Sequence, residues 1–272
     1  MKYLIVYLLF SFFLFSCSSP EKPESIFFKV HFQSKHTYEL STIRGSETVI
    51  TYSGQEIAMR KLKSMHVKNP TISNIRTKAD TELDISENEV ELTYKKTMSL
   101  DGKNQVPEGT VVRGELDAMN QPVFKTIVSS DLSIDQRIKL LQTIQNTFDQ
   151  FRFPEKQMKT GDTISVIQPL KMVMEGSEIS TVVTTTCKLV SFDQKMAQFD
   201  LTQTCQMTPT LMDNSFSGSG KGVGKMSYDI VNQIISEYSV KTDLTINKKL
   251  DYFEFDLKTK SEFQQSTQLL TK

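Results

Sequence analysis

The chain has 272 residues, and its 32 basic and 32 acidic side chains give a formal net charge of zero. The basic residues do not cluster, which argues against a nucleic-acid partner because neutralising phosphates requires concentrated Lys and Arg. The length and the 38% hydrophobic content accommodate one large β domain or two modest ones.

The N-terminus has the features of a secretory signal peptide. Lys2 supplies a positive charge, residues 3–15 are almost wholly apolar, and the small Ser16 precedes Cys17. The apolar run is shorter than the about 20 residues that span a bilayer. This pattern predicts a signal peptide over residues 1–16. The alternatives are an ordinary signal peptide with an unrelated cysteine after it, and an uncleaved membrane helix.

Leu14-Phe15-Ser16-Cys17 resembles the lipobox of bacterial envelope lipoproteins. The resemblance implies cleavage before Cys17 and attachment of lipid to its thiol and to the new amino group. Several acyl chains anchor a protein stably, because each buried methylene contributes about 0.8 kcal/mol. In the enterobacterial sorting rule an Asp after the cysteine retains a lipoprotein at the inner membrane, so Ser18 favours the outer membrane.

Residues 17–25 are expected to hold the lipidated cysteine and a polar, proline-containing tether, followed by a β-rich domain over residues 26–272. Apolar and polar residues alternate with the period of a strand in Tyr38, Leu40 and Thr42. Strands are predicted over residues 26–32, 37–43, 48–52, 56–67, 71–85, 90–99, 111–116 and 123–128. No helix-length segment separates them, which favours an antiparallel sheet.

Residues 133–151 carry the pattern of an amphipathic helix. Apolar residues recur every three or four positions, at Ile134, Ile138, Leu141, Ile144, Phe148 and Phe151. Ser133 and Gln136 form a capping-box pattern, and Asp135 suits the positive end of the helix dipole. The apolar stripe must be buried, and the sheet is the expected surface.

Strands are predicted again over residues 163–174, 179–192, 196–209, 218–230, 234–246 and 250–260. Several exceed the usual length of about 5–6 residues, as long meandering strands of curved sheets do. The expected fold is therefore mainly β, an α+β arrangement with a large curved antiparallel sheet or half-barrel and one central helix packed on it. The strands form either one sheet or two halves around the helix.

Four glycines, Gly218, Gly220, Gly222 and Gly224, alternate along one predicted strand and so share one face. The segment is not a phosphate-binding loop, because Ser219 and Met226 occupy positions where that motif needs Gly and Ser or Thr. A face without side chains permits either close approach of another element or sharp bending of the sheet. The expected neighbour is the helix 133–151 or the chain of a ligand.

Cys187 and Cys205 are an even pair in a compartment outside the cytosol, where disulfides persist. A turn near residues 193–196 places Phe192 opposite Ala197 and Cys187 opposite Thr202, so closing a bond would need a bulge or a longer offset. A disulfide and two buried free thiols are therefore both retained as alternatives.

Metal, cofactor and catalytic sites are not indicated. His31 and His36 are an odd number of residues apart and face opposite sides of a strand, and His66 is remote. The carboxylates at positions 80, 82 and 84 share a face but lack a calcium-binding loop. No known catalytic signature occurs, so we expect neither a cofactor nor an enzyme.

The chain as a whole resembles β-rich envelope lipoproteins of bacteria such as the Bacteroidota. The features that carry this resemblance are the lipobox, Tyr38-Glu39-Leu40, the central helix, residues 159–163 (Lys-Thr-Gly-Asp-Thr) and Tyr228-Asp229. Strands around one helix are also similar to the half-barrel of lipoprotein-localisation factors, a resemblance of fold. It implies a curved sheet whose apolar concave face holds acyl chains.

Three hypotheses of function follow. The first is a lipid-anchored, non-enzymatic protein that binds a hydrophobic or acylated ligand, with the helix as plug or lid. The expected lining residues are Ile138, Leu141, Phe148, Gly218, Gly220, Gly222 and Gly224. The second is a structural or interaction subunit of an envelope complex, with an exposed apolar patch and no internal pocket. The third is an enzyme, to which no residue in the sequence points.

Overall fold

The computed structural model describes residues 24–99, 106–129, 131–174, 177–208, 216–249 and 253–270. The predicted signal peptide 1–16, the lipidation site Cys17 and the tether up to residue 23 lie outside the described residues. Over the part of the chain that is described, no helix has the length and apolar character that crossing a membrane requires.

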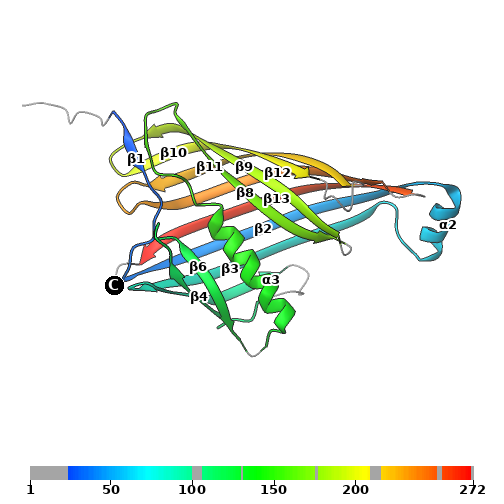
Figure 1. Cartoon of the computed structure of the whole chain (residues 1–272), viewed down its shortest axis with the longest axis horizontal. Helices are drawn as coiled ribbons and strands as arrows, with labels where there is room; N and C mark the ends of the chain where they lie inside the picture. The colour runs from blue at the N-terminus through cyan, green and yellow to red at the C-terminus, as the bar shows by residue number, and fades with distance from the viewer. Residues whose placement is uncertain are drawn as a thin grey trace, which may run out of the picture.

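One antiparallel sheet of eleven strands dominates the structure, in the order β6-β5-β4-β3-β2-β13-β12-β11-β10-β9-β8 (Figure 1). The N-terminal meander comprises β2 (His36–Gly54), β3 (Thr71–Ser86), β4 (Glu89–Ser99), β5 (Val111–Leu116) and β6 (Pro122–Val128). The C-terminal meander comprises β8 (Thr163–Met174), β9 (Ser177–Phe192), β10 (Met196–Thr208), β11 (Phe216–Asp229), β12 (Ile234–Lys249) and β13 (Phe253–Leu270). The predicted fold class, a mainly β protein with a large antiparallel sheet, is confirmed.

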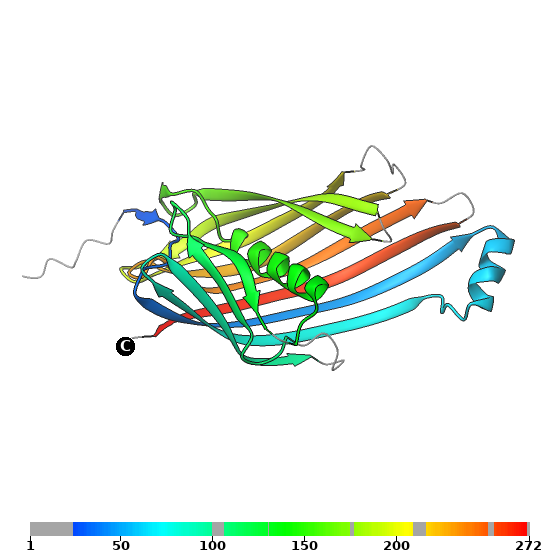
Figure 2. The same ribbon diagram turned by 60° about the horizontal axis from the view of Figure 1, so that its bottom comes forward.

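The two meanders are joined because β2 pairs with β13 along its whole length, from Phe253 opposite Gly54 to Leu270 opposite Thr37. These central strands have 19 and 18 residues, far more than the usual 5–6. The sheet does not close, since β6 and β8 are its edges. It curves into a trough that holds the helix α3 (Ile134–Asp149) (Figure 2).

The two ends of this trough differ. A second, two-stranded sheet of β1 (Ile26–Phe28) and β7 (Lys156–Met158) lies at one end, where β13 also ends (Figure 1). The helix α2 (Glu56–Ser64) lies at the opposite end. The described chain therefore begins at the end remote from α2.

The helix predicted over residues 133–151 is confirmed as α3 (Ile134–Asp149). Ser133 Oγ accepts a hydrogen bond from the Gln136 backbone N–H at 3.3 Å, and Gln136 Oε1 accepts one from the Ser133 N–H at 2.8 Å. This capping box satisfies two backbone donors that a helix start leaves unpaired. Asp135 lies in the first turn, where its negative charge interacts favourably with the positive end of the helix dipole.

The strand predicted over residues 56–67 is wrong, because residues 56–64 form α2. Good helix formers such as Leu, Met, Lys, Arg and Glu fill this segment, and Glu56 forms an i,i+4 ion pair with Arg60 at 2.5 Å. The break predicted around Gly45 is also absent. Gly45 continues β2 because it is paired on both sides, with Glu262 and with Arg76.

The core forms two main clusters on the inner side of the sheet. One is covered by β1 and β7, where the Phe28 ring packs against Tyr228 with 4.8 Å between centroids. The Tyr228 hydroxyl donates a hydrogen bond to the Lys29 carbonyl at 2.6 Å, which holds β1 in place. The other cluster lies under α3 and includes Tyr38, Leu92 and Phe148.

Candidate functional site

A pocket of about 400 Å³ lies between α3 and the inner face of β2, β3 and β4. This volume falls in the range of about 300–1,000 Å³ that small-molecule sites occupy. Ten of the described residues that line it are apolar, six from the sheet side (Leu40, Ala79, Leu92, Tyr94, Met98 and Val106) and four from α3 and the residues before it (Leu132, Leu140, Ile144 and Phe148). The walls therefore suit a hydrocarbon chain.

The polar lining of this α3 pocket consists mainly of threonines, together with Gln136 and Gln265. Its charged residues are Arg44, Lys78 and Lys139, and none of the described residues that line it is acidic. Lys78 is already paired, since its Nζ lies 3.3 Å from Asp80 Oδ1. The pocket thus combines apolar walls with an excess of positive charge.

Arg44 projects from the inner face of β2, in the alternation that also directs Leu40 toward the pocket. Its Nη2 donates a hydrogen bond to Thr147 Oγ1 on α3, and its guanidinium carbon lies 5.4 Å from the Phe263 ring centroid. Burial lowers the pKa of Arg44, and the nearby Tyr94 phenol opposes that change. Burial also raises the pKa of Tyr94 to about 12, with Arg44 acting in the opposite direction.

A second pocket of about 520 Å³ lies on the other side of α3, toward the C-terminal meander. It shares Arg44, Thr143 and Thr147 with the α3 pocket. Its other lining residues include Val183, Cys205, Val240, Leu244 and Phe263, together with polar groups such as Gln168 and Gln203. The Arg44 side chain therefore stands where two hollows meet beneath the helix.

Aromatic packing fixes the C-terminal half of α3 on the sheet. Phe148 is 5% exposed, and its ring centroid lies 5.0 Å from that of Phe124 and 5.9 Å from that of Phe32. After the helix ends, the Phe151 ring meets Tyr238 edge-on at 5.1 Å. Because Phe148 also lines the α3 pocket, the same side chain anchors the helix and forms a wall of the pocket.

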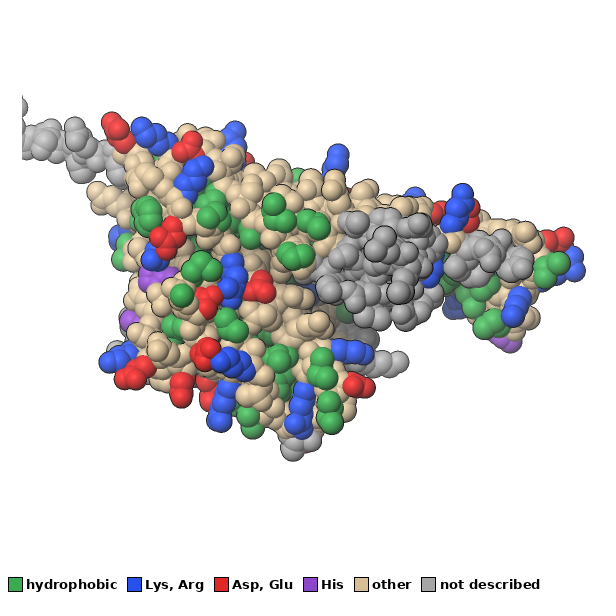
Figure 3. All heavy atoms as spheres, viewed as in Figure 1, with side chains coloured by type: hydrophobic (Ala, Val, Ile, Leu, Met, Phe, Trp, Pro, Cys, Tyr) green, Lys and Arg blue, Asp and Glu red, His purple; other side chains and the backbone are tan. Residues whose placement is uncertain are grey.

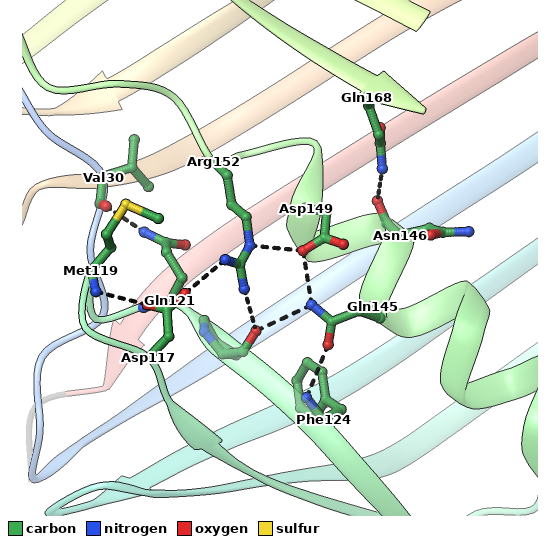
Figure 4. A network of polar contacts seen from close by, with 11 residues as sticks. Val30, Asp117, Met119, Gln121, Phe124, Gln145, Asn146, Asp149, Arg152 and Gln168 are labelled. Carbon is green, nitrogen blue, oxygen red and sulfur yellow. Dashed lines mark hydrogen bonds and ion pairs between the residues drawn. The ribbon is translucent and has the colours of Figure 1, made fainter. Parts of the chain in front are cut away.

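A polar network reinforces this attachment (Figure 4). Arg152 forms ion pairs of 2.7 Å with Asp117, in the turn before β6, and with Asp149 on α3. Gln145 Oε1 accepts a hydrogen bond from the Phe124 backbone N–H at 2.9 Å, and Gln145 Nε2 donates one to Asp149 at 2.8 Å. The end of α3 is thus tied to β6 by both apolar and charged groups.

Asp117 is the acidic anchor of this network. Burial alone would raise its pKa, but hydrogen bonds from the Gln121 and Met119 backbone N–H groups and the positive charge of Arg152 outweigh it and lower the pKa. A carboxyl group whose pKa is lowered by folding stabilises the folded state above its unfolded pKa. This contribution is lost as the pH falls through the lowered value.

The inward face of α3 differs from the predicted stripe. Ile134 is 75% exposed and Ile138 is 58% exposed, so both point away from the sheet. Residues 136, 139, 140, 143, 144, 147 and 148 line the α3 pocket instead. Of the three helix residues expected to contact a ligand, Phe148 lines this pocket, Leu141 packs beside it against the core, and Ile138 faces solvent.

The four alternating glycines lie on the inner face of β11, but neither pocket beneath α3 includes them among its lining residues. A Cβ atom added to Gly224 would lie 2.0 Å from the Ser239 carbonyl oxygen, and one added to Gly220 would lie 2.8 Å from that of Asp243. A Cβ on Gly218 would meet the Met207 sulfur at 2.5 Å, and one on Gly222 the Thr242 hydroxyl at 2.7 Å. The neighbouring strands β10 and β12, and not α3, therefore make the close contacts with the glycines.

Cys187 and Cys205 are free, buried thiols, so the disulfide alternative is not found. Phe192 pairs with Ala197 as predicted, but a register shift after Gln198 brings Leu201 opposite Cys187. Cys205 pairs with Val183, four residues from Cys187 along β9. At about 3.3 Å per residue the two Cα atoms are roughly 13 Å apart, beyond the about 7 Å that a disulfide allows. Burial raises the pKa of the Cys187 thiol to about 12.

Within the described ranges, no three His, Cys, Asp or Glu side chains converge to hold a metal ion. Arg44 is not among the site residues that the sequence predicts, because the strand expected over residues 37–43 ends just before it. The available signal was the alternation Tyr38, Leu40, Thr42, Arg44, which continues the inward face of β2 and brings a charged residue to it.

Comparisons with known proteins do not assign a family. Neither a protein-family model nor a curated protein matches the chain. Among solved structures, the chain matches the crystal structure of Ail, the attachment invasion locus protein of Yersinia pestis, with 7% identity. The match covers 85% of this chain and 99% of that chain at a TM-score of 0.14, which is too low to establish either fold or function.

Proposed function

We propose that this chain is a lipid-anchored protein of the bacterial cell envelope, most consistent with the outer membrane, that binds a hydrophobic or acylated ligand in the α3 pocket. The observation that carries the proposal is the pocket of about 400 Å³ with ten apolar lining residues beneath the helix. Burying a methylene group is worth about 0.8 kcal/mol, so a chain of several methylenes supplies useful affinity.

The proposed anchor is compatible with the position of the pocket. The described chain begins just before β1, at the end of the trough opposite α2, so an anchor at Cys17 would join the fold at that end (Figure 1). The motif around Cys17 supports the anchor, and the pocket supports the ligand.

Filling the pocket should abolish binding of an apolar probe. Ala79 lies on β3 and lines the pocket, so Ala79→Phe would project a ring into it. We expect N-phenylnaphthylamine to bind the unmodified protein saturably, with a fluorescence increase, and to lose at least about tenfold in affinity in Ala79→Phe. Tenfold corresponds to about 1.4 kcal/mol, less than the contribution of a few buried methylenes.

The matched control is Val223→Phe, which adds the same ring at a side chain that is 67% exposed and lines neither pocket. It should bind the probe like the unmodified protein. Circular dichroism confirms that each variant is folded. Unchanged binding in a folded Ala79→Phe would rule out the α3 pocket as the binding site.

A second candidate function, an interaction subunit of an envelope complex, is favoured by α2. This helix has no buried residue, and Ile57 on it and Met65 after it are 81% and 64% exposed. Figure 3 shows apolar and basic side chains close together at this end of the molecule. Such a function would depend on α2 rather than on the α3 pocket, so Ala79→Phe would leave it intact.

A further inference from the structure

The Arg44 guanidinium has little compensation from the protein for its partial burial. Of its five N–H donors, one of the two at Nη2 has an acceptor among the described residues, Thr147 Oγ1. Over the described residues, no carboxylate forms an ion pair with it. A desolvated charge without a counter-charge is unfavourable, and an anion that enters the pocket would remove that penalty.

The remaining donors have access to the pocket. Arg44 lines both hollows beneath α3, and its neighbours on β3 and β13 are Thr77 and Phe263. The Phe263 ring lies close enough to the guanidinium for a cation–π interaction. A guanidinium presents parallel N–H groups that match the two oxygens of a carboxylate.

The charge and the size of the pocket restrict the ligand further. Lys78 is paired with Asp80, and Lys139 on α3 is an exposed side chain, which leaves Arg44 as the inner positive charge. One inner guanidinium suits a monoanion. A volume of about 400 Å³ lies near the lower end of the usual range for ligand sites, which suits one hydrocarbon chain better than two.

We propose that the ligand is a long-chain carboxylate, with its head group on Arg44 and its hydrocarbon chain against the Leu92, Leu140 and Ile144 side of the α3 pocket. This inference rests on the proposed function, because it identifies the chemistry of the ligand for that same pocket. The guanidinium would make the pocket prefer a carboxylate over an uncharged head group, since an uncharged group there would leave the Arg44 charge without a counter-charge. Apolar burial would supply affinity to charged and uncharged amphiphiles alike.

The test compares two probes that differ only in their head groups, dansyl-undecanoate and its methyl ester. Both are titrated by fluorescence into the full chain carrying Cys17→Ser, which has no thiol at residue 17 to be lipidated. We expect the carboxylate to bind at least about tenfold more tightly than the ester, since hydrogen bonds to charged groups are roughly twice as strong as neutral ones. Arg44→Gln should remove this preference by weakening carboxylate binding alone.

Two further variants separate charge from structure. Arg76→Gln removes an exposed arginine next to Thr77 in sequence but outside the α3 pocket. This variant should keep the preference for the carboxylate over the ester. Arg44→Lys keeps the positive charge but lacks the planar guanidinium, so it should keep part of the preference for the carboxylate.

The outcomes distinguish the two proposals. If both probes bind equally, or if Arg44→Gln weakens them equally, the carboxylate inference is overturned while the proposed function stands. If neither probe binds to the folded, unmodified protein, the proposed function fails and the inference fails with it. A preference for the carboxylate that disappears only in the Arg44→Gln variant supports both.

Discussion

Replacing Phe148 with alanine is expected to lower the free energy of unfolding by about 3–5 kcal/mol, the range for truncating a buried aromatic residue. The Phe148 side chain is 5% exposed and packs against both Phe124 and Phe32, so its removal leaves a cavity where α3 meets the sheet. The polar network around Arg152 keeps the neighbouring end of the helix in place and limits how far the cavity can collapse. Urea unfolding followed by circular dichroism measures this change.

The control for Phe148 is on the same helix. Ile138 is 58% exposed, and Ile138→Ala should change the unfolding free energy by about 0.5 kcal/mol or less. Suppose instead that the two substitutions lowered the free energy of unfolding by similar amounts. The apolar stripe that includes Ile138 would then face the sheet, and the α3 pocket could not lie where it is described.

Gly224→Ala is expected to destabilise the fold by about 3 kcal/mol, at the upper end of the range for adding atoms to a packed region. The added Cβ would lie 2.0 Å from the Ser239 carbonyl oxygen and 3.0 Å from the Val240 Cα. Both are backbone atoms of β12, so no side-chain rotation relieves the clash. Strand β12 would have to move away from β11, and their hydrogen bonds would be lost in part.

Gly45→Ala supplies the matched comparison in a central strand. A Cβ there would lie 3.9 Å from its nearest neighbour, the Glu262 Cβ, at ordinary contact distance. Because glycine inside a strand is about 0.5–1 kcal/mol less favourable than alanine, this variant should be neutral or slightly more stable. Thermal unfolding of both variants measures the difference. Equal effects would show that β11 does not need its glycines for close strand packing.

Most of the architecture was predictable because it depends on local patterns. Strand alternation around Tyr38 and Leu40, and the capping box at Ser133, are short-range signals that tertiary contacts reinforce. The prediction of a strand for the α2 segment failed because the segment lies at an exposed tip, where no neighbouring strand pairs with it. Its helix propensity therefore determines its structure. The pairing of β2 with β13 joins the N-terminal and C-terminal meanders, whose strands are far apart in sequence, and no local pattern specifies this pairing.

The candidate site was harder to predict than the fold because it depends on how the elements are oriented. Apolar spacing predicted that α3 would pack on the sheet, but its rotation is set by Phe148 and by the network at Arg152 and Asp117. That rotation turns Ile138 outward and brings Leu140 to the pocket. The position of Arg44 opposite Thr147 on α3 follows from the same rotation, so it could not be inferred from spacing alone.

The most direct test of ligand binding is native mass spectrometry of the full chain carrying Cys17→Ser, purified from bacterial envelopes. The substitution ensures that covalently attached lipid is not mistaken for bound ligand. We expect an additional mass that corresponds to an amphiphile with a single hydrocarbon chain, is released by organic extraction and is missing from Ala79→Phe. A folded protein that carries no such mass, and that also fails to take up an added long-chain carboxylate, would contradict the proposed ligand binding.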